Sequence, residues 1–176
     1  RPGEPATVES AIAHIDNLFF NERTYDLTRV GRYKYNKKMA LSGRIVGHEL
    51  TRPVVAPLTG EILAEAGQLL TREEALNIEK RGVSFVVLNV DGKRVHVLSN
   101  GAVDLADFVS FDPAEFGIKE KVRFSVLKEM LETPDINWEE AIAERIDDLI
   151  PKHIIVDDIM ASINYLNCVA MGIGTP

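Results

Sequence analysis

The sequence predicts an α+β fold in which helical segments flank a small β-barrel-like or sandwich-like module. Apolar residues recur with helical spacing toward both ends of the chain, and short β-rich runs with glycine turns fill the middle. Of the 176 residues, 45% are apolar, which is enough for a core and excludes a wholly disordered chain. We expect three parts: residues 1–48, a β module at 49–110, and a helical part at 111–176.

The charge balance and the single cysteine narrow the class of protein. Twenty Lys and Arg residues stand against 27 Asp and Glu residues, and the formal net charge of −7 argues against a wholly basic nucleic-acid binder. One cysteine, Cys168, cannot form an internal disulfide or a cysteine-based zinc site, and it fits a reducing cytoplasm. Because the sequence has no apolar run of membrane-spanning length, we expect a cytoplasmic protein without a membrane partner. The start at Arg1, without Met, suggests a piece of a longer protein.

The N-terminal part combines an amphipathic helix with a basic strip. Residues 7–20 place apolar side chains on one helical face, and Thr7 is suited to cap that helix. From residue 27 to residue 48 the chain has no acidic residue, and tyrosines are interleaved with six basic side chains. Three roles fit such a strip: contact with phosphates, packing against an acidic neighbour, or a solvated helix face. Composition alone favours the solvated helix face. The candidate DNA contacts are Arg29, Arg32, Lys34, Lys37, Lys38 and Arg44.

Residues 51–100 follow a different pattern, with short β-rich runs between turns. Thr71 and Glu74 form a capping box that opens a helix, and Gly82 is suited to end it because glycine adopts the left-handed conformation readily. Asp91-Gly92 predicts a hairpin, since a tight two-residue turn needs positive φ at both positions. Strands are expected at 54–56, 61–65, 83–90 and 94–98.

Cap signals divide the last third of the chain into helices. Asp112-Pro113 resembles a helix start, and Asn137 opens a helix that Pro151 ends. Asp157 is expected to cap the last helix, which carries Cys168 on its apolar side. Besides the segment after residue 112, helices are predicted at 122–131, at 138–149 and after residue 157.

The sequence contains no recognisable catalytic or metal-binding motif. The sequence has neither a glycine-rich phosphate loop nor a His-Glu-x-x-His pair, and its serines lack the Gly-x-Ser-x-Gly setting. Its four histidines are scattered, and the carboxylates between residues 129 and 148 suit a solvated helix face. We expect Cys168 to be a buried, inert thiol. The residues alone therefore predict an interaction module with no catalytic, cofactor-binding or metal-binding residue.

Two stretches of the chain resemble the β subunit of bacterial DNA-dependent RNA polymerase. The first consists of RPGEPAT at 1–7, NLFF at 17–20 and YDLTRVGRYKYN at 25–36; the second runs from residue 150 to residue 166. The resemblance implies the lobe region of that subunit, which is one jaw of the cleft that holds downstream DNA. Because the family often lacks the residues between the two stretches, the β module resembles a lineage-specific insertion.

The resemblance implies a non-catalytic lobe fragment that helps to form the DNA-binding cleft during transcription. It implies the rest of β, the other polymerase subunits and downstream DNA as partners, with a regulator as a candidate partner of the inserted module. The Mg²⁺ ion of that family is bound by the partner largest subunit, so no cofactor is expected in this segment. The main alternative is a free-standing cytoplasmic interaction module that recruits a protein partner, and a small hydrolase is least favoured.

Overall fold

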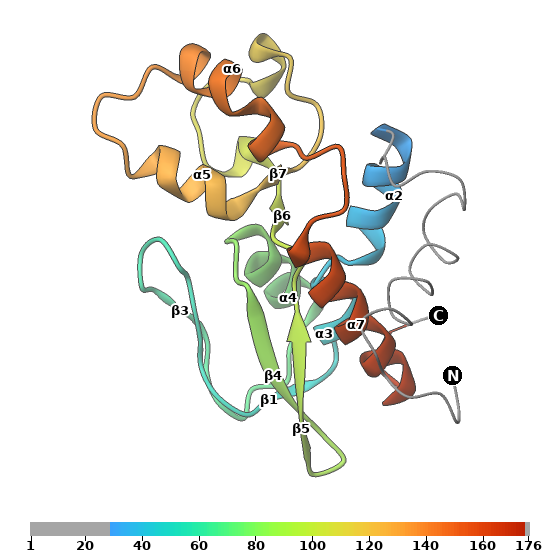
Figure 1. Cartoon of the computed structure of the whole chain (residues 1–176). Helices are drawn as coiled ribbons and strands as arrows, with labels where there is room; N and C mark the ends of the chain where they lie inside the picture. Colours follow the sequence, from blue (N-terminus) through green and yellow to red (C-terminus); the bar gives the residue numbers. More distant parts are fainter. Residues whose placement is uncertain (1–28, 175–176) are drawn as a thin grey trace.

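Short helices and three small antiparallel sheets make up the fold in a computed structural model that describes residues 29–174 (Figure 1). The helices are α2 (Arg29–Lys38), α3 (Ser42–Ile45), α4 (Arg72–Lys80), α5 (Phe124–Leu131), α6 (Trp138–Leu149) and α7 (Val156–Ala170). The strands are β1 (Glu49–Leu50), β2 (Val54–Val55), β3 (Ile62–Ala64), β4 (Phe85–Val90), β5 (Lys93–Leu98), β6 (Ala102–Val103) and β7 (Val122–Arg123). Two 3₁₀ turns are η1 (Leu105–Asp107) and η2 (Pro113–Phe116). The predicted helix at 7–20, with its cap Thr7, lies outside the described residues.

The sheets confirm the α+β class but not a barrel. The largest sheet has the strand order β1-β4-β5, while β2 pairs with β3 and β6 pairs with β7 in separate ladders. Within residues 29–174 no sheet closes on itself, so the predicted barrel is wrong. The physical reason is strand length: β1, β2 and β3 have two or three residues each, too few to pair continuously around a closed sheet.

The local signals at α4 behave as the sequence predicts. The Thr71 hydroxyl accepts from the Glu74 amide at 3.2 Å, and the Glu74 carboxylate accepts from the Thr71 amide at 2.9 Å, which completes the capping box. The hydrogen bond that the Thr71 backbone amide donates to the carboxylate is the main cause that lowers the pKa of Glu74. Gly82 follows the helix with φ +82°, as expected for a left-handed helix end.

The predicted hairpin is also confirmed. Strands β4 and β5 pair from Phe85 opposite Leu98 to Val90 opposite Lys93. The turn residues Asp91 and Gly92 have φ of 51° and 82°. This geometry explains the Asp-Gly sequence, because few other pairs adopt positive φ twice without strain.

Replacing Gly92 by Val is expected to lower the melting temperature by roughly 2–8 °C, since a side chain at positive φ costs about 1–2 kcal/mol. Thermal unfolding followed by circular dichroism would measure the shift. Asp91→Asn is the matched control, because Asn tolerates this conformation and should leave the midpoint unchanged. An unchanged midpoint for Gly92→Val would contradict the turn geometry.

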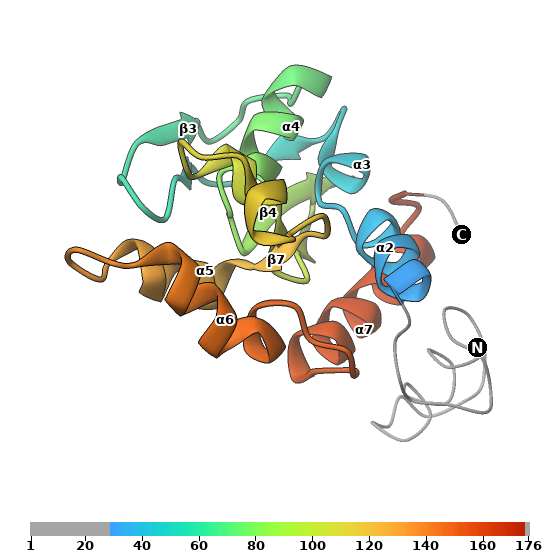
Figure 2. The same cartoon turned by 90° about the horizontal axis from the view of Figure 1, so that it is seen from above.

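The apolar interior has two main cores. The first lies between the β1-β4-β5 sheet, α3, α4 and the end of α7, and it includes Ile45, Ile78, Leu88 and Cys168. The second joins β6, β7, α5 and α6, and its residues include Val103, Val122, Leu127, Met130, Ile142 and Leu149. A smaller cluster of Tyr35, Met39, Ala161 and Tyr165 packs α2 against α7, and the two helices lie side by side in Figure 2. The division at residues 48 and 110 stays a prediction.

Three helix starts differ from the sequence prediction. The segment after Asp112 forms only the 3₁₀ turn η2, and α5 starts at Phe124 because Val122 and Arg123 pair with β6. Helix α7 starts at Val156, so the predicted cap at Asp157 is wrong. The N-terminus of α7 is capped instead by Asp158, whose carboxylate accepts a hydrogen bond from the Ile155 backbone amide at 3.0 Å. Among the helices in residues 29–174, none is both long and apolar enough to cross a bilayer.

Candidate nucleic-acid interface

Helix α2 carries most of the predicted basic strip and has two chemically different faces. Arg32, Tyr35, Asn36 and Met39 recur with helical spacing and are buried. The opposite face is exposed, and its side chains are Tyr33, Lys34, Lys37 and Lys38. The basic residues of one helix therefore have two different roles.

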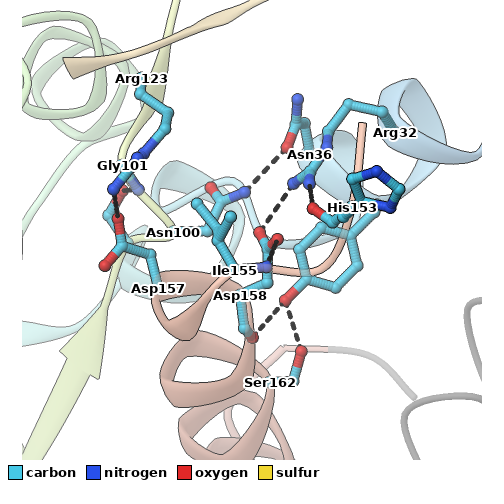
Figure 3. A network of polar contacts seen from close by, with 12 residues as sticks. Arg32, Asn36, Asn100, Gly101, Arg123, His153, Ile155, Asp157, Asp158 and Ser162 are labelled. Atoms are coloured by element: carbon cyan, nitrogen blue, oxygen red, sulfur yellow. Dashed lines mark hydrogen bonds and ion pairs between the residues drawn. The ribbon is translucent and has the colours of Figure 1, made fainter. Parts of the chain in front are cut away.

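Arg32 is held in a buried ion pair that joins α2 to α7 (Figure 3). One guanidinium nitrogen donates to Asp158 Oδ1 at 2.7 Å, and the other terminal nitrogen donates to the His153 carbonyl at 2.9 Å. The side chains of Arg32 and Asp158 are only 7% and 1% exposed. Since both charges are removed from water, each depends on the other for compensation.

Tyr35 extends this network along α7. Its hydroxyl contacts the Asp158 carbonyl and the Ser162 hydroxyl. Burial raises the pKa of Tyr35 above its ordinary value, so the phenol stays neutral. Nearby, the Asn100 amide donates to Asn36 Oδ1 at 2.8 Å and connects α2 to the chain before β6. These contacts fix the buried face of α2.

Arg44 is buried in a second polar cluster, near the end of β5. Its guanidinium donates to the Met39 and Leu98 carbonyls at 2.8 and 2.7 Å and to Asn164 Oδ1 at 3.2 Å. Asn164, on α7, also donates to the His96 carbonyl at 2.7 Å and accepts from the Leu98 amide at 2.8 Å. Burial lowers the pKa of Arg44 from its ordinary value. The Arg44 side chain thus binds backbone rather than facing solvent.

The structure separates the six predicted DNA contacts into different environments. Arg32 and Arg44 are 6% and 2% exposed and are engaged in the contacts described above. Lys34 and Lys37 are exposed, and the Lys38 ammonium lies 5.6 Å from the centre of the Tyr165 ring. Arg29 is the first residue of α2. The exposed lysines are therefore the part of the strip that is accessible to a ligand.

A cleft of about 530 Å³ lies beside α2 and brings a second basic segment next to the strip. Its wall on α2 includes Tyr33, Asn36 and Lys37. Glu79 at the end of α4, Asp104 and residues 119–121, the segment Lys-Glu-Lys, complete the lining. Nothing in the sequence marks Lys119 and Lys121, because two lysines around one glutamate form no recognisable motif and lie far from the strip in sequence.

Within residues 29–174, no three His, Cys, Asp or Glu side chains are grouped so that they could hold a metal ion. The predicted burial of Cys168 is confirmed, and burial raises the pKa of its thiol.

Comparisons with known proteins give consistent names. The chain is 48% identical over 179 aligned residues to the DNA-directed RNA polymerase subunit β of Acetivibrio thermocellus. It is 48% identical to the protein of that name from Clostridium beijerinckii and 44% identical to that from Clostridium acetobutylicum, each over 176 residues. Each alignment covers 99% of the chain, so these relatives share the stretch that was predicted to be an insertion. The chain spans only 14% of each relative's length. No protein-family model matches the chain.

Proposed function

The chain is homologous over 99% of its length to a segment of the DNA-directed RNA polymerase β subunit, and from this premise we propose that it is the lobe region of such a subunit. The observation that carries the proposal is the sequence identity of 44–48% to RNA polymerase β subunits. The chain spans 14% of the length of these subunits. In this role the chain is non-catalytic and helps to form the cleft that holds downstream DNA. Its partners are the rest of β and the other polymerase subunits, and Mg²⁺ is bound elsewhere in the enzyme.

The exposed face of α2 supports the DNA-facing part of the proposal. Lys34 and Lys37 extend into solvent, whereas the buried face of the same helix is fixed to α7 through Arg32 and Asp158. A helix that is fixed on one side keeps the backbone that carries its exposed lysines in a defined place. Lysines in such a position contact backbone phosphates without reading base sequence.

The residues predicted to be an insertion have a different proposed role. The segment that carries β2 and β3 extends to one side of the molecule (Figure 1). Val54 and Ala64 of this ladder belong to the first core, whereas the cross-strand pair Val55 and Ile62 is exposed. We place a regulator-binding role on this module because exposed apolar side chains favour contact with another protein.

The DNA contact is tested in RNA polymerase assembled with a β subunit that carries Lys34→Gln and Lys37→Gln. The salt dependence of binding is the slope of log K against log salt concentration. Each lost phosphate contact reduces the magnitude of this slope by roughly 0.9, so the loss of two lysines should reduce it by roughly two units. Binding of fluorescent duplex DNA across a series of NaCl concentrations measures it. Arg32 is left unchanged, because its removal would unfold the α2–α7 contact rather than report on DNA.

The matched control replaces Lys80 and Lys93, two exposed lysines that do not line the cleft, by Gln. It makes the same change in net charge and should leave the slope close to that of the parent. Equal slopes for the Lys34/Lys37 variant and the parent would contradict the proposed contact.

A further inference from the structure

We propose that the free edge of β4 binds an extended, acidic segment of another protein, which adds a strand to the largest sheet. The inference rests on the proposed function, because it takes the β module as the part that contacts a regulator. It goes beyond that role by giving the binding mode and the chemistry of the bound segment. Strand addition is a recurring mode of peptide recognition, in which main-chain hydrogen bonds supply affinity and side-chain pockets supply specificity.

Backbone groups at the start of β4 point away from β5 and lack partners in the described part of the chain. The Ser84 carbonyl accepts from the Ser99 amide at 2.8 Å, so the backbone of the next residue, Phe85, faces the opposite side. Val87 faces that side too, and its carbonyl accepts from the Thr51 amide at 2.9 Å. No residue in the range 29–174 bonds to the Phe85 N–H and C=O or to the Val87 N–H. These three groups are free to pair with an added strand.

A proline explains why this edge stays open. The register in which β1 pairs with β4 would put Pro53 opposite Phe85. Proline has no N–H, so it cannot donate to the Phe85 carbonyl. The next residues, Val54 and Val55, pair with β3 instead. The chain therefore diverges from β4 and leaves a groove of about 290 Å³. The groove is lined by residues 52–55, Pro57 and residues 83–87.

The groove fits an extended chain with apolar side chains. One wall consists of Pro53, Val54, Val55 and Pro57, and the other includes Phe85, which is 40% exposed. A bound helix would satisfy its own backbone groups and leave those of Phe85 unpaired, whereas an extended chain presents an N–H and a C=O at every residue. Because the side chains of a strand alternate between two faces, every second one can contact the apolar walls.

Arg52 sets the charge of the bound segment. Among the described residues that line the groove, it is the only one with a charged side chain. Its guanidinium lies 5.2 Å from the centre of the Phe85 ring, and no carboxylate within residues 29–174 forms an ion pair with it. A carboxylate on the added strand compensates this charge, and an exposed ion pair of this kind raises the affinity by up to about fivefold.

The test uses assembled RNA polymerase and a fluorescent peptide, Thr-Val-Asp-Val-Asp-Val-Thr, whose binding is measured by fluorescence anisotropy. We expect saturable binding to the parent enzyme. Arg52→Glu should weaken binding by about fivefold and should favour a peptide with Lys in place of Asp. Arg94→Glu is the matched control, because Arg94 is exposed on β5 outside the groove and should leave binding unchanged. Phe85→Pro deletes a free N–H and should lower the affinity by about two- to tenfold.

Hydrogen exchange locates the contact. In the free enzyme the Phe85 amide should exchange faster than the amide of Val86, which faces β5, and saturating peptide should slow the exchange at Phe85. Mass spectrometry with electron-transfer fragmentation resolves the two amides. Slow exchange at Phe85 before the peptide is added would mean that another segment of the polymerase already occupies the edge, and this result overturns the inference.

The remaining outcomes separate this inference from the proposed function. Weaker binding to both variants at an unchanged melting temperature supports strand addition. No saturable binding, or equal binding to the parent and both variants, overturns strand addition, while the salt slope of the Lys34/Lys37 enzyme still decides the DNA contact. Weaker binding to both variants together with a parental salt slope of the Lys34/Lys37 enzyme supports strand addition and overturns the DNA contact.

Discussion

Replacing Asp158 by Ala is expected to lower the free energy of unfolding by about 3–5 kcal/mol. The substitution leaves the Arg32 guanidinium buried without its counter-charge, since that side chain is only 7% exposed. It also removes the acceptor of the Ile155 amide at the start of α7. Urea unfolding followed by circular dichroism measures the loss.

A double replacement tests the cause of this effect. Arg32→Met with Asp158→Leu removes both charges and should recover much of the lost stability, because a buried pair contributes little net stabilisation compared with apolar groups of similar size. The cost of Asp158→Ala should therefore depend on the presence of Arg32. Equal destabilisation by Asp158→Ala with Arg32 or with Met at position 32 would contradict an ion-pair origin.

Gly82→Ala is the second substitution with a large expected effect, a loss of about 2–5 kcal/mol. Gly82 has φ +82°, where a side chain costs roughly 1–2 kcal/mol. A Cβ atom there would also overlap the ring of Phe124, with Cζ only 2.8 Å away. Overpacking of this kind costs about 1–3 kcal/mol more. Chemical denaturation of the variant and the parent gives the difference.

Gly117→Ala is the matched control, since Gly117 has φ +76° and no atom lies within 4 Å of the added Cβ. It should show only the backbone cost. Phe124→Leu in the Gly82→Ala background should relieve part of the overlap. If Gly82→Ala and Gly117→Ala are equally destabilising, the contact between Gly82 and Phe124 contributes nothing.

The sequence predicted those features that depend on neighbouring residues. The capping box of Thr71 and Glu74, the Asn137 cap and the Asp91-Gly92 turn each involve residues within three or four positions. Short-range chemistry is sufficient to specify such features. The α+β class could be predicted as well, because it depends only on which segments of the chain form helices and which form strands.

The roles of the basic residues could not be predicted in the same way. Arg32 and Asp158 are 126 residues apart, and Arg44 meets Asn164 across 120 residues, so nothing local marks these arginines as buried. Charge pattern alone placed them with the exposed Lys34 and Lys37. The proximity of Lys119 and Lys121 to α2 is also a product of the fold.

Asn164 has a consequence for self-association. Its amide group donates to the His96 carbonyl and accepts from the Leu98 amide, the two bonds that an added strand would make at this point of β5. An unprotected strand edge is a template for aggregation. By occupying these two backbone groups with one side chain of α7, the protein blocks the addition of another strand at this edge of its largest sheet.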